Sequence, residues 1–250
     1  MKIKILYEDS NILAIEKSSG ILVHPDQKSK NKTILDIFKK KYPKLEIVHR
    51  LDRETSGVLL LAKNEKAHEF LKKQFMDRVV KKTYVAIVNG WVNPPAGGDH
   101  GIINKPIGRS PADFRRRLAG RGARGELREA ITEYKVLKRF EIKPREISSR
   151  SSLPRIRGGS HTDKKFHEAL QKFTYLEIKP KTGRTHQIRV HLKFLNHPVV
   201  CDSLYNPKGV CPKGLKRMAL HAKTIEFKNL KGEIVKVESP VPKEFTGILT

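Results

Sequence analysis

The sequence predicts an α+β fold built on a largely antiparallel, mixed sheet with flanking helices. Stretches that resemble strands outnumber those that resemble helices, and short turns join many of them. Strands and helices do not alternate regularly, which argues against a parallel sheet built from repeated strand–helix units. A length of 250 residues suits one domain with a sizeable core. We therefore expect residues 1–250 to form a single domain.

The first third of the chain supplies most of the predicted strands. Short apolar stretches bounded by turn residues predict strands over 4–8, 12–16 and 21–24. Thr33 is a suitable N-cap for a helix over 34–41, which has apolar residues on one side. After a short apolar pair at 47–48, the continuous run GVLLLAK over 57–63 predicts a buried strand. Asn64 then caps a second amphipathic helix, and a strand is expected over 82–92.

The middle of the chain differs in composition from both ends. Residues 105–128 are rich in arginine and glycine and too poor in apolar residues to fold as an element, so a basic loop is expected. Alternation over 131–140 predicts a strand, and the polar stretch over 141–170 predicts a flexible insertion. The remaining expectations are a strand over 173–180, a helix over 184–195 entered from Gly183, and strands over 222–227 and 234–238.

The charge of the chain indicates a polyanionic partner. Lysine and arginine outnumber aspartate and glutamate by 52 to 26, a net charge of +26. Such a field attracts RNA, DNA or an anionic membrane. No signal peptide and no run near the roughly 18 apolar residues of a membrane span is present, so we expect a cytoplasmic protein without a membrane partner. Cys201 and Cys211 could form a bridge, but reduced thiols are favoured in that compartment.

The segment HRLDRETSG, residues 49–57, is the most informative part of the sequence. It crowds polar groups between two apolar runs, which a core does not tolerate but the mouth of a cleft does. Arg50 and Arg53 flank Asp52 and favour its ionised form, which can serve as a nucleophile or base. A surface turn held by salt bridges is the alternative. A glycosidase pair of Asp52 and Glu54 is disfavoured, because such carboxylates flank the scissile bond roughly 5 Å or more apart.

A second polar cluster lies in GRTHQIRVH, residues 183–191. His186 and His191 are five positions apart, so they do not share a helix face as zinc-binding HExxH histidines do, and no metal site is expected. The start of a helix at 183–185 suits a phosphate group, because free backbone N–H groups point outward there. Tyr84 follows two lysines and suits base stacking, although a tyrosine on a strand is more often part of the core.

These motifs resemble the RluA-type pseudouridine synthases. The segment HRLDRETSG resembles the family core HRLDxxTSG, and three other segments follow in the family's order, at 8–25, 81–90 and 182–205. Ser18 and Cys201 replace the proline and glycine usual in the family. The chain starts directly at the first motif, so we expect no separate N-terminal RNA-binding domain. The resemblance implies a pseudouridine synthase catalytic fold with a central RNA-binding cleft.

The resemblance also implies roles for individual residues. Asp52 would start the isomerisation of uridine, Tyr84 would stack on the target base, and Arg189 would pair with Asp52. No metal or organic cofactor is expected. The target base must be flipped out of its stack, and Arg50 could fill the gap. The full set of residues expected to bind RNA is His49, Arg50, Thr55, Arg115, Arg116, Arg117, Arg184, His186 and Gln187.

Two other functions stay open from the sequence. An RNA-binding or ribosome-assembly protein could keep the fold without activity, and a hydrolase could use Asp52 to release uracil. The partner is expected to be ribosomal or transfer RNA, bound by a monomer. Arg115, Arg116 and Arg117 would form part of a basic clamp that contributes RNA affinity.

Overall fold

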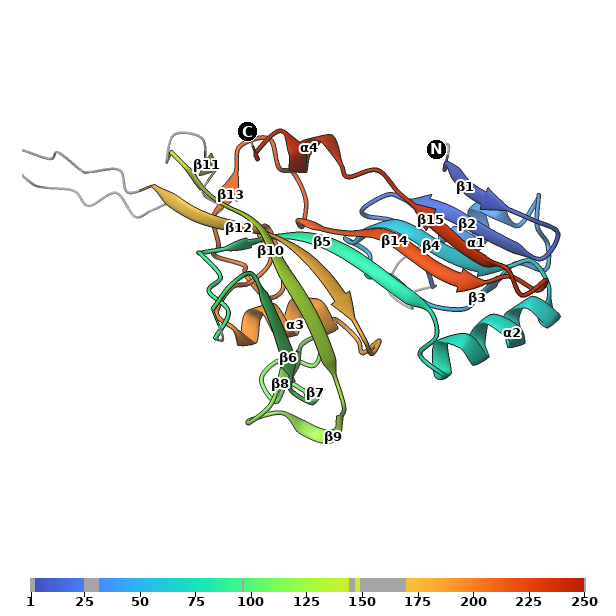
Figure 1. Cartoon of the computed structure of the whole chain (residues 1–250), viewed down its shortest axis with the longest axis horizontal. Coiled ribbons are helices and arrows are strands. Elements are labelled where there is room, and N and C mark those ends of the chain that lie inside the picture. Colours follow the sequence, from blue (N-terminus) through green and yellow to red (C-terminus); the bar gives the residue numbers. More distant parts are fainter. Residues whose placement is uncertain (1–2, 25–31, 96, 144–146, 149–169, 250) are drawn as a thin grey trace, which may run out of the picture.

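A computed structural model describes residues 3–24, 32–95, 97–143, 147–148 and 170–249 (Figure 1). Its helices are α1 (Ile34–Phe38), α2 (Glu65–Met76), α3 (Gln187–Phe194) and α4 (Lys243–Thr246). Its strands are β1 (Ile5–Glu8), β2 (Ile12–Lys17), β3 (Glu46–Ile47), β4 (Ser56–Ala62), β5 (Lys81–Asn89), β6 (His100–Asn104), β7 (Ile107–Arg109), β8 (Arg117–Ala119), β9 (Arg124–Arg128), β10 (Ile131–Ile142), β11 (Ile147–Ser148), β12 (Gln171–Pro180), β13 (Cys211–Pro212), β14 (Leu220–Lys228) and β15 (Ile234–Glu238).

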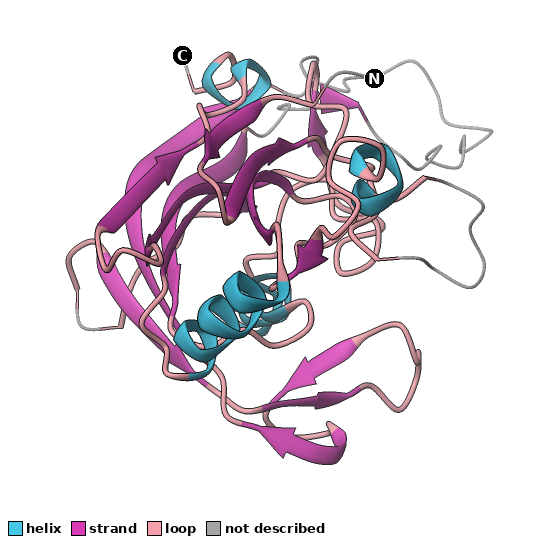
Figure 2. Cartoon of the chain, turned by 90° about the vertical axis from the view of Figure 1, so that its right-hand side faces the viewer, coloured by secondary structure: helices cyan, strands magenta, loops and turns pink. Residues whose placement is uncertain are grey.

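The predicted α+β class is confirmed. Within the described residues, ten strands form one sheet whose main path runs β1-β2-β4-β14-β5-β12-β10-β6, with β15 beside β14 and β3 beside β4. Neighbouring strands are antiparallel except for β4 and β14, which are parallel. Figure 2 shows that this sheet is strongly curved. The parallel pair brings the start of β4, directly after HRLDRET, to the middle of the sheet.

The apolar run in β4 is buried on both faces of the sheet. Leu59 and Leu61 pack with α1 in one core cluster, whereas Val58 and Leu60 pack with α2 in another. Successive side chains of a strand point to opposite faces, so an uninterrupted apolar run is what a doubly covered strand requires. The helix caps follow the sequence as well. The side chains of Thr33 and Asn64 accept hydrogen bonds from the first turns of α1 and α2.

Three predicted elements differ from the structure. The expected strand at 21–24 is wrong, because these residues make one isolated bridge, Leu22 to Thr33, and only Ile21 and Val23 enter the core. Helix α1 ends at Phe38 rather than at position 41. Helix α3 begins at Gln187 rather than at 184, because His186 takes a left-handed backbone with φ of 56° that no helix accommodates.

The basic segment 105–128 is not the loop that its composition predicted. It forms a three-stranded sheet in the order β8-β7-β9. Ile107 and Ala119 from this sheet pack against Val190 of α3 and against Tyr205. The segment therefore folds on an apolar surface supplied by another part of the chain, which a local count of apolar residues cannot reveal.

Two further expectations concern the second half of the chain. Most of the insertion expected over 141–170 lies outside the described residues. The expectation of two reduced thiols is wrong in the structure, where Cys201 and Cys211 form a disulfide with Cα atoms 5.3 Å apart. That separation is within the range a disulfide spans, and only the fold brings the two together. In the described part of the chain, no helix has the length and apolarity to span a membrane.

Candidate active site

The segment HRLDRETSG forms the turn that leads from β3 into β4. Asp52 lies in this turn, and the N–H of Thr55 donates to its carbonyl oxygen at 3.1 Å. Gly57 follows at the point where β4 meets β14. Its φ is +113°, and a Cβ atom there would lie 2.1 Å from the Ala222 carbonyl oxygen. Only glycine fits so close an approach, so Gly57 fixes the point at which the turn joins β4.

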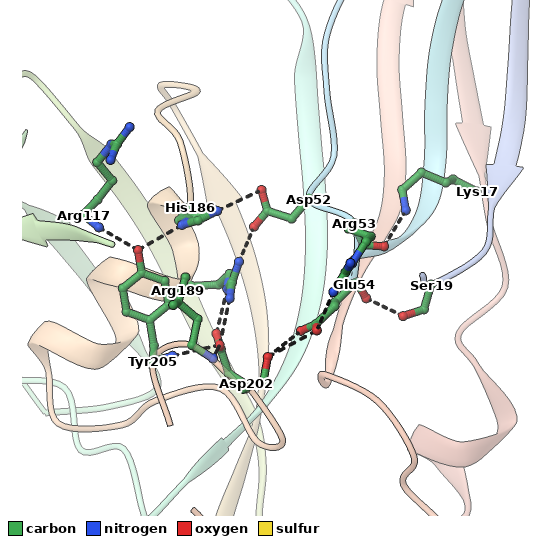
Figure 3. Close-up of polar contacts among 12 residues, drawn as sticks. Lys17, Ser19, Asp52, Arg53, Glu54, Arg117, His186, Arg189, Asp202 and Tyr205 are labelled. Carbon is green, nitrogen blue, oxygen red and sulfur yellow. Dashed lines mark hydrogen bonds and ion pairs between the residues drawn. The ribbon is translucent and has the colours of Figure 1, made fainter. Parts of the chain in front are cut away.

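Donors from the segment 17–20 hold the turn by bonding to its backbone carbonyl groups. Lys17 is fully buried and its Nζ donates to the carbonyl of Arg53 at 2.9 Å, as does the N–H of Gly20 at 2.8 Å. Ser19 Oγ donates to the carbonyl of Glu54 at 2.7 Å. Burial lowers the pKa of Lys17 to about 7, against the opposing charge of Asp52. The Asp52 side chain points from this turn toward Arg189 and His186 (Figure 3), and Asp52 lines the pocket.

Arg189 links Asp52 to a second, fully buried carboxylate. Its Nη1 donates to Asp52 Oδ2 at 2.9 Å. Its Nε and Nη2 donate to the two oxygens of Asp202 at 2.7 Å and 2.8 Å. Burial alone would lower the pKa of Arg189, but its bonds to Asp202 and the charges of both carboxylates raise it above its ordinary value. The pairing expected between Arg189 and Asp52 is therefore present, and Arg189 is a permanent cation.

His186 and Tyr205 lie between the other side of Asp52 and the basic sheet formed by β7, β8 and β9. His186 Nε2 lies 3.9 Å from Asp52 Oδ1, and its Nδ1 lies 3.0 Å from the Tyr205 hydroxyl. That hydroxyl also accepts from the N–H of Arg117, the first residue of β8, at 2.9 Å. Burial lowers the pKa of His186, against the opposing effect of Asp52. The left-handed backbone of His186 thus aims its ring between Asp52 and Tyr205 (Figure 3).

Asp52 and Tyr84 line the same pocket, which has a volume of about 530 Å³. A space of this size is in the range usual for ligand sites. Tyr84 lies on β5 beside Ala222 of β14 and Ile178 of β12. Burial raises the pKa of the Tyr84 hydroxyl, and the charge of Asp52 raises it further. The Tyr84 phenol therefore stays neutral.

The structure brings most of the sequence-predicted residues to this pocket. Those that line it are His49, Arg50, Asp52, Thr55, Tyr84, Arg184, His186, Gln187 and Arg189. Arg50 is exposed at the pocket, as a residue that enters a nucleic-acid stack must be. Arg115, Arg116 and Arg117 do not line the pocket and lie at the β7–β8 turn and the start of β8. The pocket and the basic sheet are separate features.

Two residues expected to bind RNA are instead occupied inside the protein. The side-chain amide of Gln187 bonds to Thr182, to the N–H of Arg184 and to the carbonyl of Ile131, which shapes the turn before α3. His49 Nε2 accepts from the N–H of Leu60 at 3.0 Å, and its ring stacks on Phe75. Burial lowers the pKa of His49 to about 3, so its ring is neutral. These contacts use the side-chain amide of Gln187 and Nε2 of His49, and both residues line the pocket.

The alternative chemistries receive no support from the geometry. Residues 52–54 belong to a turn rather than a strand, and Glu54 bonds to Ser203 outside the pocket lining, so the two carboxylates do not face one substrate. His191 is buried between Thr132 and the carbonyl of Lys105. Among the described residues, no group of three His, Cys, Asp or Glu side chains could hold a metal ion.

Sequence reasoning did not assign three residues of this site. Asp202 and Tyr205 belong to the closing motif at 182–205 and are three positions apart. Asp202 Oδ1 accepts the N–H of Tyr205, and the Tyr205 ring lies 5.0 Å from the Arg189 guanidinium. Both residues therefore lie beside Arg189. Lys17 was recognised as part of the first motif but given no role. A lysine in an otherwise apolar strand, ILAIEK, was the available signal.

Comparisons with known proteins agree on one family. Residues 11–194 match the family model described as RNA pseudouridylate synthase. The chain is 32% identical to ribosomal large subunit pseudouridine synthase D of Xanthomonas campestris, over 99% of this chain and 69% of that protein. It is 31% identical to the uncharacterized RNA pseudouridine synthase YlyB of Bacillus subtilis, over 100% of this chain and 72% of the relative.

Solved structures resemble the fold. Human RNA pseudouridylate synthase domain containing 1 superposes with a TM-score of 0.71 at 24% identity, over 96% of this chain and 83% of the other. Human RNA pseudouridylate synthase domain containing 4 superposes with a TM-score of 0.65 at 25% identity, over 97% and 90%. The likeness extends over both halves of the curved sheet.

Proposed function

The chain belongs to the RluA-type RNA pseudouridine synthase family, and on this premise we propose that Asp52 starts the isomerisation of a uridine flipped into the pocket. The observation that carries the proposal is the contact between Asp52 and Arg189 at 2.9 Å. A buried, permanently charged guanidinium keeps a neighbouring carboxylate ionised and oriented. Asp52 thereby meets both requirements of an initiating group, charge and a fixed direction.

The reaction exchanges one bond of uracil for another. The bond from the sugar to nitrogen 1 breaks, the base rotates, and a bond to carbon 5 forms. Carbon 5 loses its proton and nitrogen 1 takes one up, so the product is an isomer of the substrate. Asp52 acts either by adding to the sugar or by removing a sugar proton. Tyr84, a neutral phenol in the same pocket, stacks on the uracil and relays the proton from carbon 5, giving up its own hydroxyl proton as it takes that proton up.

The uridine must leave its stack before Asp52 can reach it. A base inside a duplex is inaccessible, so enzymes that act on a base extrude it into a pocket. Arg50, exposed beside Asp52, fills the gap that the base leaves, because a planar guanidinium stacks as well as it pairs. Loops of structured RNA suit this step, since their bases are already partly unstacked.

The proposed substrate is ribosomal or transfer RNA, with large-subunit ribosomal RNA first. Relatives that carry the name ribosomal large subunit pseudouridine synthase D support this order. The net charge of +26 supplies affinity for phosphates of any sequence and favours a monomer through self-repulsion. These RNAs place the enzyme in the cytoplasm.

Mapping pseudouridine in total RNA from cells with and without the gene tests the proposal. We expect one or a few positions in ribosomal RNA to lose the modification in the deletion strain. The purified chain should restore them on unmodified RNA without added metal or cofactor. Free uracil as the product would indicate a hydrolase, and RNA binding without any product would indicate an inactive binding protein.

A further inference from the structure

The lining of the pocket that contains Asp52 is strongly positive. Seven lysine and arginine side chains line the pocket against one carboxylate, that of Asp52. They are Arg50, Lys72, Arg78, Lys82, Lys181, Arg184 and Arg189. Arg189 is committed to Asp52 and Asp202, and Arg50 lies beside Asp52 in the turn. The others come from the end of α2, the start of β5 and the turn before α3, and the proposed reaction gives them no role.

Arg78 and Arg184 meet at one residue, Glu129. Arg78 Nη2 donates to Glu129 Oε2 at 2.5 Å, and Arg184 Nε donates to the carbonyl oxygen of Glu129 at 2.9 Å. Glu129 lies between β9 and β10, so this contact joins the turn after α2, the basic sheet and the turn before α3. Only Arg78 reaches the Glu129 carboxylate, whereas Arg184 reaches the backbone of the same residue, so both guanidinium groups lie at Glu129. Guanidinium groups are the donors that proteins use for bidentate binding of phosphate.

The backbone of Arg78 is unfavourable for an arginine. Its φ is 59°, in the left-handed region, one residue beyond the C-cap of α2. The N–H of Val79 donates to the carbonyl of Gln74 at 2.9 Å, which is the helix ending that glycine normally occupies. The Arg78 side chain is 49% exposed, so it does not serve the core. An exposed ion pair contributes little stability in return. The strain therefore points to a use outside folding.

We propose that Arg78 and Arg184 form a binding site for a backbone phosphate of the RNA that flanks the flipped uridine. In the free protein the Glu129 carboxylate pairs with Arg78, and Arg184 bonds to the Glu129 backbone carbonyl. RNA phosphate displaces the carboxylate, which releases Arg78 and loosens the tie between the turn after α2 and the basic sheet. The proposal rests on the proposed function, because it takes the substrate to be RNA that enters the same pocket.

Two substitutions with opposite expected effects test the site. Binding of a fluorescein-labelled RNA stem–loop with uridines in its loop is measured over a range of salt concentrations. Arg78→Gly should weaken binding and reduce the slope of log affinity against log salt by about 0.7 to 0.9, the value of one phosphate contact. Its melting temperature should equal or exceed that of the wild type, because glycine relieves the left-handed strain. Glu129→Gln should strengthen binding, since it removes the competing anion.

A matched ion pair elsewhere controls for net charge. Arg139 donates to Asp99 at 3.2 Å and to the carbonyl of Val92 at 3.1 Å, and neither Arg139 nor Asp99 lines the pocket. Asp99→Asn removes the same charge as Glu129→Gln and should strengthen binding less. Equal effects of the two, or a wild-type salt slope for Arg78→Gly, would overturn the phosphate site.

The product assay separates this proposal from the proposed function. If the wild type forms pseudouridine and Arg78→Gly keeps the wild-type salt slope, the phosphate site is wrong and the proposed function stands. If the wild type binds the stem–loop with the expected response to both substitutions but no RNA gives pseudouridine, the phosphate site stands and the proposed function is wrong. A wild type that binds no RNA contradicts both.

Discussion

Asp202 holds Arg189 through both of its carboxylate oxygens, at 2.7 Å and 2.8 Å, and so directs the remaining nitrogen of the guanidinium to Asp52. Asp202 is fully buried and also accepts from the N–H groups of Leu204 and Tyr205. Burial alone would raise the pKa of Asp202, but its bonds to Arg189 lower it below the ordinary value. Asp202 therefore sets the orientation of Asp52 indirectly, through Arg189.

Removing the guanidinium should affect stability as well as catalysis. Arg189→Met leaves the buried Asp202 charge unpaired, which we expect to lower the free energy of unfolding by about 3–5 kcal/mol. It should also abolish most product formation, because Asp52 loses its partner. Arg184→Met is the control from the same segment. It should leave the melting temperature unchanged and weaken RNA binding, and an exchange of the two phenotypes would contradict the assignment.

Tyr84→Phe separates the ring from the hydroxyl. Burial raises the pKa of Tyr84, so the group acts as a neutral phenol throughout the working pH range. The Phe variant should bind RNA almost normally but fail to complete the product, whereas Tyr84→Ala should lose both. Single-turnover rates and RNA affinities measure the two effects. A fully active Phe variant would remove the hydroxyl from the mechanism.

The basic sheet should contribute affinity without taking part in the chemistry. Changing Arg115, Arg116 and Arg117 to Gln removes three charges that lie outside the pocket lining. The bond from the Arg117 N–H to Tyr205 survives, because it uses the backbone. The Michaelis constant at physiological salt should rise and the salt dependence of binding should become shallower, while the rate at saturating RNA changes little. An unchanged salt dependence would show that these residues do not meet phosphate.

Acid should destabilise the protein through two histidines, the half-buried His49 and the buried His221. Burial lowers the pKa of His49 to about 3 and that of His221 to about 4, below the ordinary value of about 6.5. Between its folded pKa and pH 6.5, each histidine is neutral in the folded state and protonated in the unfolded state. Their stabilisation is therefore complete above about pH 6.5 and is lost as the pH falls towards the folded pKa. Each contributes a slope of about 1.4 kcal/mol per pH unit.

Urea unfolding between pH 7 and pH 4 measures this slope. His221 bonds to Ser56 and faces the carbonyl of Ser239, and His221→Asn should make the slope shallower. Replacement of His100, which is exposed, should not change it. The same slope in His221→Asn as in the wild type would contradict a neutral buried histidine.

Local patterns predicted the elements that they determine directly. The uninterrupted apolar run of β4, the caps Thr33 and Asn64, and the alternation in β10 follow from the period of strands and from the unsatisfied N–H groups of helix ends. The family resemblance identified Asp52, Tyr84 and Arg189, and the structure places all three at one pocket. Their catalytic roles stay predictions.

Other features depend on contacts that a local pattern does not contain. The basic sheet folds because Val190 and Tyr205 offer it an apolar surface from far along the chain. The start of α3 depends on the left-handed backbone of His186, and the role of Gln187 depends on the carbonyl of Ile131. The left-handed backbone of Arg78 and its contact with Glu129 likewise depend on the fold.

The most direct test of the central claim is the rate of Asp52→Asn. RNA carrying tritium on carbon 5 of uridine reports each turnover as tritium released into water. Asn preserves the shape of Asp52 but removes its charge, so we predict no release above background, with RNA affinity and melting temperature close to the wild type. Retention of even about a tenth of the wild-type rate, a barrier change of only about 1.4 kcal/mol, would show that Asp52 does not start the reaction.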